Sequence, residues 1–291
     1  VGHPGAAYLL GRTSADGWWY FFPVSFFLKT PVALHALMVM AVAGFVGWTG
    51  RQGPDPDHRD PEGTAGPDSG SEPRERPAPV APWQSRLRAP AVGFLVFLAF
   101  LLTSNLNVGT RYALPAWVAL LLLVAAGVDR LHVAVGARAR AAVLALGLLY
   151  GVSTLASMPY YLAYRSEWTW GRGPGREALV DSSVDWGQGL VALRDFQTRE
   201  ATGPVRLSYF GSALPSAYGI EYQPLPSFLD LPAGPLPAGA GPPSVTVISV
   251  TNLHGLYLGG ADPLASYRSR EPDAVLAGSL YVYREGPDAG G

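Results

Sequence analysis

Two cations stand where apolar segments begin or end, and their side chains could hold a phosphate group. Lys29, the only lysine, follows an aromatic run from Trp18 to Phe22, and Arg111 lies between two apolar segments. An arginine guanidinium can make paired contacts to phosphate oxygens, and a lysine ammonium supplies a point charge. Alternatively, both side chains are interfacial anchors that reach the lipid headgroups without touching a substrate.

Two carboxylates flank the segment DSSVDWGQ, which precedes an expected helix. Asp181 and Asp185 could form a pair that faces a substrate. Alternatively, one of them caps the helix by accepting its free backbone N–H groups, with Trp186 packed toward a membrane.

The composition excludes several classes of protein. A net charge of −1 offers no basic face for nucleic acid, and the absence of cysteine excludes disulfides, thiolate metal sites and cysteine nucleophiles. The five histidines show no metal-ligand spacing, so the sequence identifies no metal site and no cofactor, and a divalent metal stays an open question. The phosphate-binding and dinucleotide-binding glycine motifs and the serine-nucleophile elbow are also absent.

Four apolar spans are expected to cross a membrane as helices. Each is close to the ~20 residues that the hydrocarbon core requires, and the charged fraction of 15% is well below that of soluble domains. The spans are Pro23–Trp48, Ala89–Leu106, Tyr112–Val128 and Ala141–Met158. The loop at about 50–88 is rich in proline, glycine and charged residues, so we expect it to be disordered.

The distribution of arginine predicts the orientation of these spans. Most loop arginines lie between spans one and two and between spans three and four, and arginine-rich loops face the cytoplasm. An even number of spans then puts both ends of the chain outside a bacterial plasma membrane. The sequence begins as if in the middle of a loop, without an initiator methionine or a signal peptide, so we expect a fragment of a longer protein.

The residues from 159 to 291 predict a small extracytoplasmic α/β domain after the transmembrane region of residues 1–158. Gly187–Ala201 has the spacing of an amphipathic helix. Val205–Phe210, Ser244–Val250 and Ser279–Tyr283 have the composition of strands. The expected fold class is therefore membrane α-helical, with about four transmembrane helices, followed by this domain.

Four segments, in this order, resemble a known enzyme family. They are GWWYFFPVSFFLKTP from Gly17, SNLNVGTRYALP from Ser104, DSSVDWGQGL from Asp181 and SVTNLHGLYL from Ser249. Together they resemble the C-terminal half of bacterial membrane glycosyltransferases related to the dolichyl-phosphate-mannose protein mannosyltransferases (family 39-like). The resemblance implies a GT-C fold and a polyprenyl-phosphate sugar donor. It also implies the lipid bilayer and a glycan or protein acceptor as partners.

Two features depart from the family. Tyr112 stands where the family has histidine, and the family's catalytic acidic residues lie in a first outer loop to which no part of this sequence corresponds. The catalytic base is therefore unassigned, and we expect the chain alone to be inactive. With a lipid-phosphate donor, Lys29 and Arg111 could hold its phosphate, because both are expected at the outer end of a span, unless they only anchor the chain at the interface. Gln188 and Asn107 could hydrogen-bond sugar hydroxyls.

A second function from another class stays open. The chain could be a non-catalytic membrane protein whose outer α/β domain binds a glycan or a protein partner. A transporter is less favoured, because the expected spans contain no acidic residue.

Overall fold

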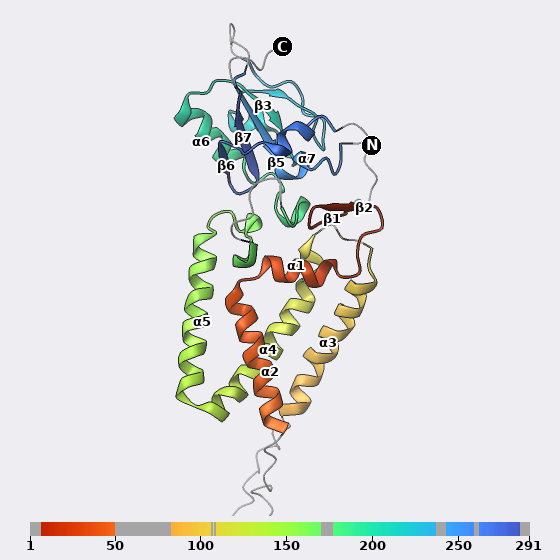
Figure 1. The fold of residues 1–291 in the computed structure, drawn as a ribbon, viewed down its shortest axis with the longest axis vertical. Helices are drawn as coiled ribbons and strands as arrows, with labels where there is room; N and C mark the ends of the chain where they lie inside the picture. The colour runs from red at the N-terminus through yellow and green to blue at the C-terminus, as the bar shows by residue number, and fades with distance from the viewer. Residues whose placement is uncertain are drawn as a thin grey trace, which may run out of the picture. The chain divides into compact units, whose positions relative to one another are not determined.

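The computed structural model describes residues 7–49, 83–105, 107, 109–169, 177–236, 243–258 and 262–285. Figure 1 labels the α-helices and all strands except β4. The chain divides into two compact units. One comprises Val1–His35, Leu98–Leu114 and Leu148–Gly291, and the other comprises Ala36–Phe97 and Pro115–Gly147. Most of the loop expected to be disordered, residues 50–82, lies outside the described residues. Residues 83–88, which we counted with that loop, are helical.

The N-terminal part is helical, and two or three of its helices are long and apolar enough to cross a membrane. These are Thr110–Val135, Ala137–Ala156 and, if a bent pair counts as one span, α1 (Phe21–Lys29) with α2 (Val32–Thr49). Within α3 (Trp83–Thr103), Leu87–Thr103 is a shorter apolar helix. Two or three of the four expected spans therefore have a helix of suitable length, and the count of four stays a prediction.

The expected loop between the third and fourth spans is mostly helical. The helix α4 (Leu114–Val135) follows the 3₁₀ turn η1 (Thr110–Ala113), and a single residue, Gly136, separates α4 from α5 (Ala137–Ala156). Gly136 has a φ of +72° and donates its N–H to the carbonyl of His132 at 2.7 Å. A glycine in the left-handed region is the usual way to end a helix, because it lacks a Cβ.

The expected span Pro23–Trp48 is not one continuous helix, because the chain breaks at Thr30 and Pro31. The helices α1 and α2 meet at an angle of 113°. Thr30 is extended, with φ −120° and ψ 144°. Proline disfavours the helical conformation in the residue before it and has no N–H to continue the ladder of hydrogen bonds. The two residues at the break therefore account for the turn.

Groups left open by this break bond to a segment more than 130 residues away. Lys29 Nζ donates to the carbonyls of Leu162 and Tyr164 at 2.7 and 2.5 Å, and the N–H of Ser166 donates to the carbonyl of Leu28 at 2.9 Å. Across the break, the N–H of Val32 donates to Glu167 Oε2 at 2.9 Å. We call residues 162–168 the clamp segment.

The clamp segment also contacts the first turns of α2 through His35. Trp168 Nε1, which can only donate, lies 3.0 Å from His35 Nδ1. His35 Nδ1 must therefore be an acceptor, and Nε2, 2.9 Å from Thr30 Oγ1, carries the proton of the neutral ring. The clamp segment and the helix break thus bond through both backbone and side chains.

In the other unit, α2 and α4 approach closely where small residues face each other. A Cβ added to Gly127 would lie 2.7 Å from Cα of Ala41, which is closer than real side chains come. The guanidinium of Arg130 lies over the ring of Phe45, 4.6 Å from its centroid. Small residues let helix backbones pack in contact, which is the usual interface between helices in membranes.

The C-terminal part contains a five-stranded mixed sheet in the order β4-β3-β5-β7-β6. Its strands are β3 (Val205–Ser208), β4 (Tyr222–Pro224), β5 (Val245–Ser249), β6 (Ala274–Leu276) and β7 (Leu280–Arg284). The pairs β3–β4 and β3–β5 are parallel, and β5–β7 and β6–β7 are antiparallel. The expected strands at β3, β5 and β7 are confirmed, and the sequence did not indicate β4 or β6.

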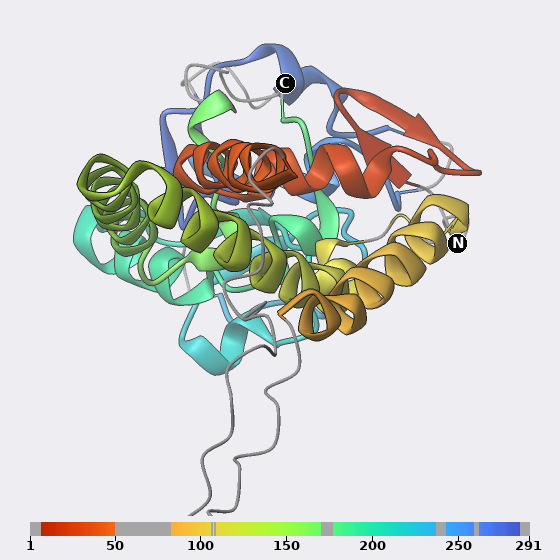
Figure 2. The same ribbon diagram turned by 90° about the horizontal axis from the view of Figure 1, so that it is seen from below.

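Two helices and a hairpin complete this region. The expected amphipathic helix is confirmed as α6 (Leu190–Glu200), whose Leu190, Leu193 and Phe196 are buried in the core of the sheet. A short helix α7 (Val250–Leu253) follows β5 directly. The strands β1 (Ala7–Leu9) and β2 (Arg12–Ser14) form an antiparallel hairpin, which lies beside α1 in Figures 1 and 2.

Replacing Lys29 by Met should lower the stability of the protein. The change leaves two carbonyls without their donor, and a buried polar group that loses its partner costs about 1–3 kcal/mol. We expect a clearly lower midpoint of thermal unfolding in detergent. The control is Arg12→Met, because Arg12 is exposed on β2. Equal midpoints for both variants and the unchanged protein would contradict the clamp.

Candidate functional site

The segment Asp181–Gly189 is held by buried hydrogen bonds of the Asp185 carboxylate. Asp185 is 0% exposed. Its Oδ1 accepts from the N–H of Gly187 at 3.2 Å, and its Oδ2 accepts from the hydroxyl of Ser249, the last residue of β5. Burial raises the pKa of Asp185 to about 6, although these hydrogen bonds lower it. Asp185 therefore fastens the segment to the end of β5.

This geometry corrects one of the interpretations of the two carboxylates. The helix α6 begins at Leu190 after Gly189, and no side chain caps it. Neither Asp181 nor Asp185 is therefore an N-terminal cap of α6. Because Asp185 is fully buried, a pair in which both carboxylates face a substrate is also not what the structure shows.

Asp181 lies at the other end of the segment in an unusual backbone conformation. Its φ is +61°, in the left-handed region, and its N–H donates to Thr251 Oγ1 at 2.9 Å. Tyr257 donates its hydroxyl to Asp181 Oδ2 at 2.7 Å. Burial raises the pKa of Asp181, and the hydrogen bond from Tyr257 and the charge of Arg111 oppose this rise. Strained backbone conformations of this kind often mark functional positions.

Contacts link the four segments that carry the family resemblance, and three of the segments interact at Asp181. Asp181 and Asp185 bond to Thr251, Tyr257 and Ser249 of the fourth segment. Arg111 of the second segment acts electrostatically on Asp181, and a Cβ on Gly109 would collide with the side chain of Ser182. The N–H of Trp18, in the first segment, donates to Asn107 Oδ1 at 2.5 Å. Segments far apart in the sequence are therefore joined by a set of contacts, most of whose polar side chains are buried.

Asn107 and Gln188, expected as possible contacts to hydroxyl groups, bond within the chain. Asn107 is buried, and its Nδ2 donates to the carbonyl of Ser104 at 3.2 Å. Gln188 Oε1 accepts from the N–H of Trp186 at 2.8 Å, and its Nε2 donates to the carbonyl of Val184 at 2.9 Å. Both side chains stabilise loops, and their contact with a ligand stays a prediction.

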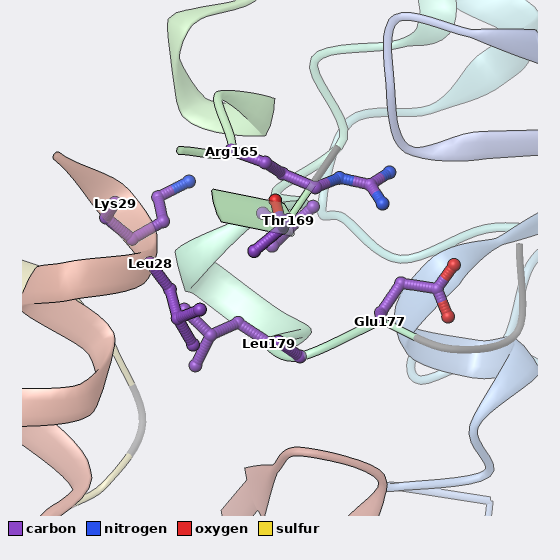
Figure 3. Close-up of a pocket in the computed structure, with 8 residues that line it drawn as sticks. Leu28, Lys29, Arg165, Thr169, Glu177 and Leu179 are labelled. Carbon is purple, nitrogen blue, oxygen red and sulfur yellow. The ribbon is translucent and has the colours of Figure 1, made fainter. Parts of the chain in front are cut away.

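Lys29 and Arg111 have different partners in the structure. Figure 3 shows Lys29 beside a small cavity of about 20 Å³, which has room for one water molecule. The cavity is also lined by Arg165 and Glu177. Two hydrogen bonds of the Lys29 ammonium are used by the clamp segment, whereas Arg111 is exposed beside Asp181. The role of Lys29 in phosphate binding stays a prediction.

The carboxylate of Glu177, four residues before Asp181, makes two further hydrogen bonds. Glu177 is 3% exposed, and its Oε2 lies 2.6 Å from His254 Nε2. Its Oε1 accepts a hydrogen bond from the hydroxyl of Tyr281. Burial raises the pKa of Glu177, but the bonds from His254 and Tyr281 outweigh it and hold the pKa below its usual range. Tyr8 of β1 donates to the backbone carbonyl of Glu177 at 3.0 Å.

Trp186 points outward from the same segment. It is 49% exposed, and its ring meets that of the buried Phe210 edge to face at 5.3 Å. Sequence reasoning missed Phe210, Tyr257 and Asn252 as parts of the candidate site. Two of them belong to the fourth segment, SVTNLHGLYL, so the segment itself was the available signal.

Comparisons of the chain with family models, with curated proteins and with solved structures found no match. Within the described part of the chain, no group of three or more histidine or acidic side chains could hold a metal ion. The site is therefore described by its own geometry: a carboxylate at Asp181, a tyrosine hydroxyl, an exposed arginine and an exposed tryptophan.

Replacing Asp185 by Asn should change how stability depends on pH. Because the pKa of Asp185 rises from 3.8 to about 6 on folding, the unfolded chain releases the proton first. The stabilising effect of the neutral carboxyl is complete below about pH 4 and is lost as the pH rises to about 6. Asn is neutral throughout, so the variant should gain roughly 3 kcal/mol relative to the unchanged protein over this range.

Thermal unfolding in detergent between pH 4 and 7 measures this difference. Asp16→Asn is the control, because Asp16 is exposed on the surface. A constant difference between the Asp185 variant and the unchanged protein across this range would show that the carboxylate is not buried as described.

Proposed function

We propose that this chain is the C-terminal portion of an integral membrane glycosyltransferase that uses a polyprenyl-phosphate-linked sugar. The observation that carries the proposal is the set of contacts that joins three of the resembling segments at Asp181 and links the first to the second through Trp18 and Asn107. Segments that served only to cross or anchor in a membrane would not need to share polar contacts. These contacts bring together groups suited to a phosphate and to sugar hydroxyls.

Each group has a distinct part in this proposal. The exposed guanidinium of Arg111 contacts the donor phosphate, for which its planar set of donors is well suited. The carboxylate of Asp181, positioned by Tyr257, accepts hydrogen bonds from sugar hydroxyls. Stabilising the departing phosphate lowers the barrier to transfer, because negative charge develops there. The base that activates the acceptor is unassigned.

The alternative proposal is a non-catalytic membrane protein whose outer domain binds a glycan or a protein partner. The burial of Asp185 favours it, because one of the two candidate carboxylates is withdrawn from any substrate. Dependence on the lipid phosphate separates the two proposals. An enzyme of the proposed class should bind the polyprenyl-phosphate sugar much more tightly than the free sugar, and a glycan-binding domain should not.

Replacing Arg111 by Met should weaken binding of the donor. We propose to titrate the chain in lipid nanodiscs with polyprenyl-phosphate mannose, glucose and galactose. Loss of a charge-assisted contact of about 2–5 kcal/mol corresponds to a dissociation constant that is roughly 30-fold higher or more. The matched control is Arg12→Met, also exposed and expected on the same side of the membrane. Equal effects of both changes would remove the support for an enzyme. Equal affinities for the polyprenyl-phosphate sugar and the free sugar would do the same.

The proposed location is the bacterial plasma membrane, with the sheet domain outside the cell. The chain has no cysteine, so a single introduced cysteine can be labelled without background. Ser69→Cys should react only from the cytoplasmic side, because arginine-rich loops stay there. Ser269→Cys, in the turn Ala265–Ser269, should react from outside. Labelling of both positions from one side would contradict the proposed orientation.

A further inference from the structure

Four aromatic rings pack together next to Asp181, with the buried Phe210, 1% exposed, in contact with the other three. Trp186 meets Phe210 at 5.3 Å, Phe210 stacks on Tyr257 at 5.8 Å with an angle of 10°, and Phe228 lies 4.9 Å from Tyr257. Trp186 and Phe228 are 49% and 39% exposed. We call these four side chains the aromatic platform.

The platform lies where the parallel strands of the sheet end. Phe210 follows β3 by two residues, Phe228 follows β4 by four, and Tyr257 follows β5 through α7. The strands β3 and β5 are neighbours in the sheet. After β3 the chain passes to β4 on one side, and after β5 it passes to β6 and β7 on the other side. Such a reversal between neighbouring parallel strands is the place where open α/β sheets bind ligands, outside the carboxyl ends of the strands.

A buried polar group lies at this reversal. Asn252, 1% exposed, donates from Nδ2 to the hydroxyl of Ser208, the last residue of β3, at 3.0 Å. Among the side chains and backbone that the structure describes, no donor reaches its Oδ1. A buried amide oxygen without a donor is costly, so a hydroxyl group or an ordered water would stabilise it.

We infer that the aromatic platform is a saccharide-binding subsite, and that the acceptor of the proposed transferase is a glycan chain. The identification of the glycan as an acceptor rests on the proposed function, whereas the saccharide-binding subsite does not. Ligand sites typically combine aromatic walls with a few placed polar groups. A pyranose ring matches this pattern, because it presents C–H groups on its faces and hydroxyls at its edge. The exposed rings of Trp186 and Phe228 meet the faces, and the hydroxyls reach toward Asp181 and Asn252, which are 5% and 1% exposed.

The extent and exposure of the platform favour a glycan chain over other occupants. The two exposed rings, Trp186 and Phe228, both pack against the buried Phe210, at 5.3 and 5.1 Å, so the platform offers two neighbouring rings for two sugar units. Only Trp186 and Phe228 present much surface, whereas a stable interface with a folded protein covers about 800 Å² on each partner. A carboxylate beside the rings suits hydroxyl groups better than the apolar side chains of a peptide.

The test is binding of free saccharides to the whole chain in nanodiscs, without donor. The probes are mannotetraose, maltotetraose, cellotetraose and laminaritetraose, and a serine- and threonine-rich peptide serves as the competing ligand. At least one tetrasaccharide should bind, with ring protons close to aromatic protons in saturation-transfer NMR. The affinity should fall at least fivefold in Trp186→Ala and be largely kept in Trp186→Phe.

A matched control separates the platform from exposed tryptophan in general. Trp19 is 67% exposed outside the platform, so Trp19→Ala should leave saccharide binding unchanged. Because Trp186 lies at the surface, its Ala variant should keep the thermal unfolding midpoint of the unchanged protein. If that midpoint falls, Phe228→Ala replaces it and should give the same loss of binding.

The results separate this inference from the proposed function. Saccharide binding that depends on Trp186, without donor binding that depends on Arg111, would keep the subsite and remove the transferase. Donor binding with no tetrasaccharide bound at millimolar concentration, or with the peptide bound at the platform instead, would overturn the subsite and keep the transferase. Saccharide binding unchanged in Trp186→Ala and Phe228→Ala would also overturn it.

Discussion

The buried carboxylate of Asp185 is the interaction on which the candidate site depends. It joins the segment before α6 to the end of β5, and it does so without reaching solvent. With this bond in place, Trp186 faces outward and Asp181 is held beside Tyr257. The fully buried carboxylate of Asp185 thus helps to position Asp181, which is 5% exposed. Burial disfavours the charged form of Asp185, and the hydrogen bonds from Ser249 and Gly187 partly offset this effect.

The clamp segment plays the corresponding role at the break between α1 and α2. A chain that leaves helical conformation among apolar side chains must find partners for its backbone groups, because unpaired groups away from water are costly. Here the partners are Lys29, Glu167 and the carbonyls of the clamp segment. The sole lysine is therefore a bridge between distant parts of the chain as well as a charge. Its partners lie far along the sequence, so its position in the aromatic segment did not reveal them.

Composition and periodicity predicted the broad organisation but not its details. Long apolar runs identify helices because burial in lipid demands them, and the β-branched run at Ser244–Val250 identified β5. Pro31 signals the break at Thr30, but the apolar segments on both sides of it also fit a single span. The strands β4 and β6 have three residues each, too few to show alternation, and exist only through their partners in the sheet.

The candidate site shows a similar limit. The sequence identified Asp181 and Asp185 because they flank a segment before an expected helix, and Arg111 because it lies between two apolar spans. It could not tell that both carboxylates would be buried, since the partner hydroxyl of Asp185 lies 64 residues away. The aromatic platform was not predicted for the same reason: its rings come from four separate segments, and only the sheet brings them together.

The bonds of Glu177 and Asp181 have a consequence for the length of the chain. These two residues are four positions apart, and their partners His254 and Tyr257 are three positions apart, so two short stretches are joined at two points. Side chains can be exchanged at one point while the other holds the alignment. Inserting or deleting one residue between the points would shift one stretch against the other. The spacing of this region should therefore vary much less among related sequences than the identity of its exposed residues.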